Sequence, residues 1–285
     1  MAMRDGLSAV KTAAWLGWQM DSNWADPFLF AVYSVAKPLA GALILLFIYR
    51  VVGRGASDTG FFANMYVGNA FFALVGQVTL GMSWVIIEDR EFFRMIRYIY
   101  TSKAQYRLYL LGRGLSKLAV AMISVLVLMI FGRFVLSVPV RISTVNWPLL
   151  SSVLALGLVC SIGVGFVMAS LMFFIARHGG STSEAVTGLL YLLCGVLYPV
   201  SALPLWAQAV SRIIPLTYWV EALRRAVLGD DIARQFTGAW AGGTRGLLMV
   251  LALSAAAVLA LGLFLFHVGE RSAKARGVID LAQDY

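Results

Sequence analysis

The chain has 285 residues, of which 60% are hydrophobic and only 13% carry a charge. A soluble domain of this length carries about twice that fraction of charged side chains, so this composition excludes an ordinary soluble protein and indicates a membrane protein. The net charge of +9 points to a cytoplasmic membrane surface and to anionic lipid, and we predict no binding of nucleic acid.

Residues 1–27 are predicted to form an amphipathic helix that lies on the membrane surface, because apolar and polar positions separate onto opposite faces. Its apolar face holds Met3, Leu7, Val10, Ala14 and Trp18. A first span is expected over 28–49. Lys37 and Pro38 fall near its centre, where an ammonium group costs at least about 2.5 kcal/mol. We predict that Lys37 faces a hydrated pathway or an acidic partner; the alternative is a lysine that snorkels to the membrane surface.

Residues 61–87 form the second predicted span, which carries no charge. Aromatic side chains crowd its first half, and such residues usually form a packing surface or a belt at the membrane interface. In the alternative interpretation, aromatic and polar side chains line a route for substrate. The residues of this candidate translocation pathway are Lys37, Asn64, Tyr66, Asn69 and Gln77.

The loop over 88–117 contains seven of the 23 Lys and Arg residues of the chain. This concentration predicts that the loop is cytoplasmic. Its acidic start favours a helix N-terminus, and the apolar residues that follow suit a groove on a partner protein. The alternative is a basic loop that only faces lipid. The candidate contact residues are Glu88, Asp89, Arg90, Glu91, Phe92, Phe93 and Arg94.

Four further spans are predicted, over 115–138, over 149–176, from about 184 onwards, and over 246–268. Small residues recur at every fourth position of the span over 149–176, which allows another helix to approach closely. These residues are Gly157, Ser161, Gly165 and Ala169. Six spans in total place both termini on the cytoplasmic side.

Three prolines interrupt the apolar stretch that follows the fifth span, at Pro199, Pro204 and Pro215. Proline removes a backbone donor and clashes with the preceding turn, so the stretch cannot be one straight helix. Broken backbone at membrane depth is tolerated only where protein or a watery cavity satisfies its polar groups. We therefore predict a re-entrant helical hairpin over 201–229 beside a pathway. Its candidate gate residues are Tyr198, Pro199, Pro204, Pro215, Tyr218 and Arg224.

Two ordered sets of residues resemble motifs of the ABC-2 type transporter permeases, the membrane subunits of a class of ATP-driven exporters. The first set is Gly195, Pro199, Leu203-Pro204, Ile214-Pro215, Tyr218 and Ala222-Leu223-Arg224. The second set is Asp89-Arg90-Glu91, which has Asp where the family has Glu, followed by Leu111-Gly112-Arg113. In the family, this second region is the coupling helix that docks on the ATPase. The resemblance covers nearly the whole chain.

The resemblance implies an all-α, polytopic membrane protein with six transmembrane helices. An N-terminal interfacial helix over 1–27 would precede a transmembrane domain over 28–285. That domain would include a cytoplasmic coupling helix in the loop 88–117 and the re-entrant hairpin over 201–229. Both termini would be cytoplasmic, and the protein would lie in the cell membrane.

The resemblance also implies a permease that works as a homodimer with two copies of a separate ATP-binding subunit, which holds the MgATP. The few polar groups in the spans favour a lipophilic drug or a lipid as the exported substrate. One alternative is a lipid-linked polysaccharide, and another, from a different class, is a channel or scaffold protein without ATP coupling.

The chain lacks the patterns of several catalytic classes. It has no Gly-Lys pair and therefore no Walker A loop for ATP. Its two His residues are too few and too far apart for a metal site. An intramembrane protease would need a serine or an aspartate dyad within its spans, and no predicted span contains an aspartate. We predict no catalytic residue, no metal and no cofactor in the chain itself.

Overall fold

The computed structural model describes residues 2–23, 27–52, 59–101, 105–140, 145–175, 179–236, 240 and 242–277. All the regular secondary structure in these residues is helical, so the all-α prediction is confirmed for them. The helices are α1 (Ala2–Asn23), α2 (Pro27–Val52), α3 (Thr59–Ile87), the π-helical turn η1 (Glu88–Phe92), α4 (Ile96–Thr101), α5 (Tyr106–Phe134), α6 (Trp147–Met172), α7 (Gly179–Leu193), η2 (Val200–Ala202), α8 (Leu205–Ile213), α9 (Pro215–Leu228), α10 (Asp230–Ala233), η3 (Arg234–Phe236) and α11 (Thr244–Ala275).

Within the described residues, four helical segments are long and apolar enough to cross a membrane. They are Thr59–Phe92 (α3 with η1), Tyr106–Phe134 (α5), Trp147–Met172 (α6) and Thr244–Ala275 (α11). Two other predicted spans fall short of this measure, because the apolar piece of α2 runs only over Pro38–Val51 and α7 has 15 residues. Both helices still belong to the bundle, since α2 packs on α5 and α3 and α7 packs on α3.

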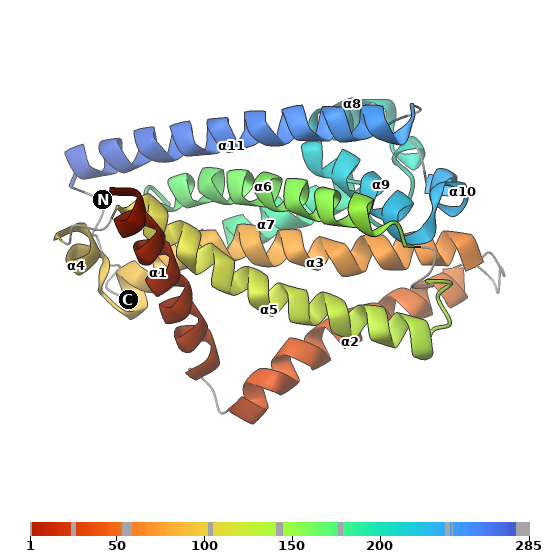
Figure 1. Cartoon of the computed structure of the whole chain (residues 1–285), viewed down its shortest axis with the longest axis horizontal. Coiled ribbons are helices and arrows are strands. Elements are labelled where there is room, and N and C mark those ends of the chain that lie inside the picture. Colours follow the sequence, from red (N-terminus) through yellow and green to blue (C-terminus); the bar gives the residue numbers. More distant parts are fainter. Residues whose placement is uncertain are drawn as a thin grey trace.

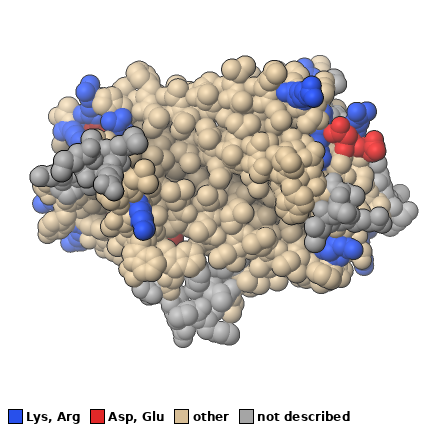
Figure 2. Space-filling model, viewed as in Figure 1, with Lys and Arg blue, Asp and Glu red and all other residues tan. Residues whose placement is uncertain are grey.

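The long helices α3, α5, α6 and α11 run side by side along the length of the molecule (Figure 1). The turn η1, helix α4 and the end of α11 lie at one end, and α8, α9 and α10 lie at the other. Figure 2 shows charged side chains gathered at these two ends, with an almost uncharged surface between them on the visible face. This is the surface of a multi-pass membrane protein, whose middle band faces hydrocarbon.

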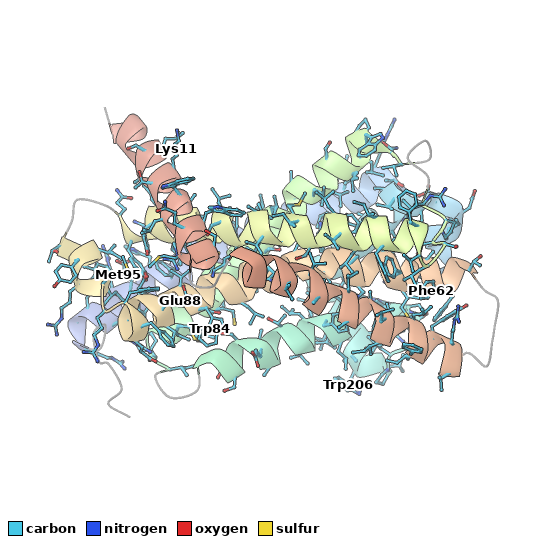
Figure 3. All side chains as sticks on the ribbon, turned by 90° about the horizontal axis from the view of Figure 1, so that it is seen from below. Lys11, Phe62, Trp84, Glu88, Met95 and Trp206 are labelled. Atoms are coloured by element: carbon cyan, nitrogen blue, oxygen red, sulfur yellow. The ribbon has the colours of Figure 1, made fainter. Side chains whose placement is uncertain are left out.

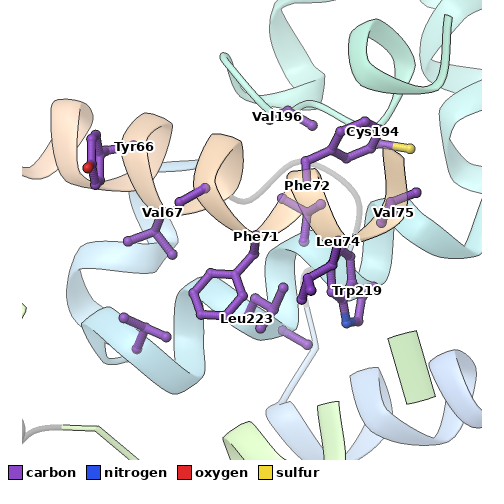
Figure 4. Close-up of a cluster of buried hydrophobic side chains, with 14 of the residues drawn as sticks. Tyr66, Val67, Phe71, Phe72, Leu74, Val75, Cys194, Val196, Trp219 and Leu223 are labelled. Carbon is purple, nitrogen blue, oxygen red and sulfur yellow. The ribbon is translucent and has the colours of Figure 1, made fainter. Parts of the chain in front are cut away.

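Helix α3 is the centre of the bundle. It is apolar around its whole circumference, which is the pattern of a buried helix, and it packs on α5, α6, α7 and α9. Near α9, its aromatic and branched side chains form a core with Trp219 and Leu223 (Figure 4). The aromatic first half of the second predicted span therefore forms a packing surface.

Small residues set the distance between α6 and its neighbours. The four residues of the predicted small-residue face are all buried, and a side chain at Gly157 would overlap the Trp219 indole of α9. The close approach of α6 to α11 uses another face, where Gly163 meets Gly262 backbone to backbone. The prediction of close packing is confirmed, and the structure adds that α9 and α3 (through Met82 and Gly165) are the partners of the predicted face.

The predicted start of the third span differs from the structure. The third span was expected from residue 115, but α5 begins at Tyr106, so residues 106–117 of the predicted loop are helical. The basic residues there were predicted to lie in a cytoplasmic loop, whereas Arg113 is buried and paired inside the protein. In addition, α2 continues through Pro38, which membrane helices tolerate when neighbours satisfy the freed carbonyl. The side chain of Lys37 lies outside the described residues.

Candidate functional site

The turn η1 ends the central helix and redirects the chain into α4. Its geometry depends on two backbone hydrogen bonds, from the Phe93 amide to the Glu88 carbonyl (2.8 Å) and from the Met95 amide to the Asp89 carbonyl (2.9 Å). The backbone of Arg94 lies in the left-handed region at φ +49°, which residues other than glycine rarely adopt. The chain therefore leaves α3 through a sharp and specifically bonded turn.

Asp89 is the buried centre of this turn. Its carboxylate has no exposed surface and accepts hydrogen bonds from the hydroxyls of Tyr106 (3.2 Å) and Tyr109 (3.0 Å) on α5. The Arg113 guanidinium lies 3.9 Å from the same carboxylate. A buried carboxylate is stable only when it is paired and hydrogen-bonded, and α5 supplies all of these partners.

The pairing extends through Glu88 to α1. Arg113, itself without exposed surface, donates to the Glu88 carboxylate, and Lys117 lies 3.8 Å from that carboxylate. Lys117 also donates to Asp21 at the end of α1 (2.6 Å). We call Asp21, Glu88, Asp89, Tyr106, Tyr109, Arg113 and Lys117 the η1 network. It joins α1, η1 and α5 by side-chain bonds.

The Leu111-Gly112-Arg113 motif places a helix contact next to the cation of the network. A side chain at Gly112 would lie 2.5 Å from the Val10 carbonyl oxygen and 2.6 Å from the Ala13 methyl group, so glycine allows α1 to lie directly on α5. The next residue, Arg113, supplies the cation of the network. Sequence reasoning quoted this motif but did not identify Arg113, Tyr106 or Tyr109 as partners of the acidic turn.

The predicted contact residues of the turn divide into a buried and an exposed group. Asp89 and Arg90 are buried, and Arg90 donates to the Met172 carbonyl (3.2 Å) and to Glu91 (3.0 Å). Glu88, Glu91 and Phe93 are partly buried. Phe92 is 58% exposed, Arg94 is exposed, and Tyr98 of α4 is 76% exposed beside them. Figure 3 shows Glu88 and Met95 at the same end of the molecule. We call Phe92, Arg94 and Tyr98 the η1–α4 surface.

A cavity of about 690 Å³ lies between α2, α3, α5 and α7. Its lining is mostly apolar, with a few polar side chains. One polar pair crosses it, because the Tyr191 hydroxyl of α7 donates to the Asn69 amide oxygen of α3 (2.7 Å). Gly41 of α2 and Gly188 of α7 also line the cavity, and neither has a neighbour within 4 Å of the position where a side chain would begin.

The predicted pathway residues separate around this cavity. Asn69 and Gln77 line it. Asn64 lies five residues before Asn69, about 140° around the helix, and donates to the Ile232 carbonyl (2.7 Å). Tyr66 is buried against α5, where its hydroxyl donates to the Leu128 carbonyl (2.6 Å). Tyr191 and the two glycines were missed, because neither an isolated tyrosine nor an isolated glycine in a span is a motif.

The three prolines after α7 each begin a helix. Pro199 and Pro204 precede η2 and α8, and Pro215 is the first residue of α9, positions at which the missing amide proton is not needed. Helix α8 lies at the surface with large apolar side chains exposed, Trp206 among them (Figure 3). Helix α9 is buried almost throughout. Protein thus satisfies the broken backbone, as the sequence required.

Arg224 of α9 joins three parts of this end of the molecule. Its guanidinium is buried and donates to the carbonyls of Gly195 (2.9 Å) and Val196 (2.7 Å) after α7, and to the carbonyl of Asn64 on α3 (3.0 Å). A side chain at Gly68 would lie 2.6 Å from it. The other two predicted polar gate residues bond locally, Tyr198 to the Leu192 carbonyl (2.8 Å) and Tyr218 to the Arg212 carbonyl (2.7 Å).

Four helical segments long and apolar enough to cross a membrane, with a mostly apolar cavity beside two of them, are the features of a multi-pass membrane protein. The profile of the ABC-2 type transporter family matches residues 9–228, from α1 to the end of α9. The chain therefore belongs to the ABC-2 type transporter family, and it is a non-catalytic transport permease. A comparison with curated protein sequences finds no match.

The η1 network predicts a large loss of stability when Arg113 is replaced by Met. Removing one partner of a buried ion pair costs about 3–5 kcal/mol, because the other charge is left unpaired, so the melting temperature of the purified chain in detergent should fall by roughly 5 °C or more. Arg133→Met, at the exposed far end of the same helix, is the matched control and should change it by about 1 °C.

A double variant separates the network from a general effect of losing charge. Arg113→Met combined with Glu88→Gln should lose less stability than the sum of the two single variants, because they share one interaction. Strict additivity, or an equal loss for Arg133→Met, would contradict the assignment of Arg113.

Proposed function

We propose that this permease is the membrane subunit of an ATP-driven exporter that moves a lipophilic drug or a lipid-like molecule out of the cytoplasm or the inner leaflet. One observation carries the proposal: the helix that lines the cavity is the same continuous helix that ends in the acidic turn. Helix α3 lines the cavity with Asn69 and Gln77 and then continues without a break into η1. A force applied at the turn would therefore reach the cavity through a single rigid element.

The η1–α4 surface is the proposed docking site for a separate ATP-binding subunit, present in two copies with MgATP bound to it. The seven Lys and Arg residues of 88–117 support a cytoplasmic position for this end. Exposed aromatic side chains beside a cation suit an interface, since aromatic residues and Arg dominate binding energy. In this proposal, the buried Asp89 and Arg90 hold the coupling turn in shape, and Phe92, Arg94 and Tyr98 make the contact.

The η1 network would transmit the motion. Because its bonds tie α1 and α5 to the end of α3, the three helices would reorient together when the ATP-binding subunits close, as a rigid body about an interface. The η1–α4 surface and the cavity are then two ends of one moving unit.

The lining of the cavity supports the substrate class. A volume of about 690 Å³ lies in the range of pockets for drug-sized ligands, which are mostly apolar with a few placed polar groups. Here Asn69, Gln77 and Tyr191 are such groups. We further propose that α2 and α7 are the first and fifth of six spans, and that a second copy of the chain completes the pathway as a homodimer.

At the opposite end, α8 and α9 form the proposed re-entrant hairpin and outer gate. The exposed apolar side chains of α8 suit the membrane interface, and the buried α9 reaches α3 through Arg224. With six spans, both termini are cytoplasmic. Arg224 would hold the gate closed by bonding the end of α7 and α3 at once.

The alternatives make different use of the same residues. A lipid-linked polysaccharide exporter would be favoured by aromatic rings that face the pathway, but the rings at the start of α3 pack on Tyr49 and Phe236. An ATP-independent channel or scaffold protein would have no need of the η1–α4 surface, so substitutions there would leave its function intact.

Loss of the two exposed aromatic side chains tests the docking site. Phe92→Ala combined with Tyr98→Ala should weaken association with the copurifying ATP-binding subunit by about tenfold or more and lower the ATPase activity of the complex in lipid nanodiscs accordingly. The control is Phe134→Ala, another exposed aromatic residue, at the far end of α5, which should leave both unchanged. Unchanged association in the double variant, or the absence of any ATP-binding partner, would favour the channel or scaffold.

Filling the cavity tests the pathway. Gly188→Phe places a ring in open space, so the variant should fold and bind its partner normally, yet a lipophilic fluorescent dye and an NBD-labelled phospholipid should no longer stimulate ATP hydrolysis or be transported. Gly188→Ala adds one methyl group and should retain at least about half of the stimulation. If transport persists in the phenylalanine variant, substrate does not pass through this cavity.

A further inference from the structure

A second, smaller cavity of about 300 Å³ lies at the η1 end between α4, the start of α5 and the end of α11. It is separate from the cavity on α3 and from the η1–α4 surface. Its lining includes Tyr100, Arg107, His267, Glu270, Arg271 and Lys274. Three cationic side chains against one carboxylate give it a net charge of +2 with His267 neutral, which favours an anion.

Within the described part of the chain, one of the three cations is paired inside the protein, and the other two are not. Lys274 donates to Glu270 (2.8 Å) and lies 4.3 Å above the Tyr100 ring. Among the described residues, Arg107 and Arg271 have no ion pair, so their guanidinium groups are available to a ligand. Burial, with the Glu270 carboxylate adding to it, raises the pKa of Tyr100, and this phenol stays neutral. Guanidinium groups bind phosphate oxygens with planar, two-point geometry.

The surface of α11 leads directly to this cavity. Leu261, Phe264 and Val268 are exposed apolar side chains, and Arg271 continues their row at helical spacing of three or four residues. A ligand with an acyl chain along α11 would therefore bring a polar head to the position of Arg271.

From this geometry we propose that the cavity binds the phosphate headgroup of an anionic membrane lipid, with the two arginines contacting the phosphate and an acyl chain lying along Leu261, Phe264 and Val268. Basic cavities between membrane helices at the water boundary are suited to such headgroups. A bound lipid would join α4, α5 and α11. The site is independent of the transported substrate, because it does not share the cavity on α3.

Native mass spectrometry of the purified full-length chain in detergent tests the site. Dioctanoyl phosphatidylglycerol should bind at least about tenfold more tightly than dioctanoyl phosphatidylcholine. Both lipids carry a phosphate, but the choline cation of phosphatidylcholine would be repelled by the net positive charge of the cavity. Arg107→Gln with Arg271→Gln should remove this preference. The matched control is Arg133→Gln with Arg245→Gln, which changes exposed arginines at the opposite ends of the same two helices, and should preserve it.

Two further arms keep the result decisive. Glu270→Gln removes the one carboxylate that the described residues contribute to the cavity lining and should tighten phosphatidylglycerol binding several-fold, a gain that misfolding cannot produce. Inorganic phosphate should compete only at far higher concentrations than the lipid. Equal loss in both arginine pairs, no gain in Glu270→Gln, or competition by phosphate at the concentration of the lipid would overturn the proposal.

Discussion

The burial of Asp89 at the end of the central helix is the constraint on which the η1 end depends. A carboxylate without exposed surface requires a compensating cation and hydrogen-bond donors, and all of them come from α5. Arg113 also pairs with Glu88, and Lys117 pairs with both Glu88 and Asp21. The ion pairs that neutralise the acidic turn therefore fix the positions of α1 and α5 as well. The same bonds that stabilise the turn make α1, α3 and α5 one unit.

The opposite end follows the same principle with different chemistry. There Arg224 is a buried cation that donates hydrogen bonds to backbone carbonyls. These carbonyls belong to Gly195 and Val196 after α7 and to Asn64 near the start of α3. Pro199, Pro204 and Pro215 interrupt the backbone, and α9 fills the space inside the protein. Helix α3 thus carries a bonded charge cluster at one end, a bonded guanidinium at the other, and the cavity between them.

What the sequence predicted well was local chemistry. The three prolines had to interrupt the stretch after the fifth span because of their missing amide proton. The uncharged aromatic stretch of α3 was expected to pack or to lie at the interface, and the four-residue spacing of small side chains on α6 was expected to face another helix. These conclusions need only the residue and its neighbours in the chain, and the structure agrees with them.

The sequence could not identify partners that come from distant parts of the chain. A count of basic residues assigned Arg113 to a cytoplasmic loop, whereas the structure buries it beside Glu88 and Asp89. Asn64 and Asn69 look alike in the sequence, but only Asn69 turns toward α7 and the cavity. Helix length alone also does not identify α2 and α7 as membrane spans, because α7 has 15 residues and the apolar piece of α2 is shorter still.

The central claim of this account is that ATP turnover at the η1 end moves the helices around the cavity. Electron spin resonance distances between labels at Gly41→Cys and Gly188→Cys measure this directly, since both sites are open and lie on α2 and α7, and the native Cys160 and Cys194 are buried. Labelled chains, diluted with unlabelled chain, would be compared without nucleotide and with ATP trapped in the complex. The account predicts a shift between two distance populations. An unchanged distribution in a complex that hydrolyses ATP would contradict it.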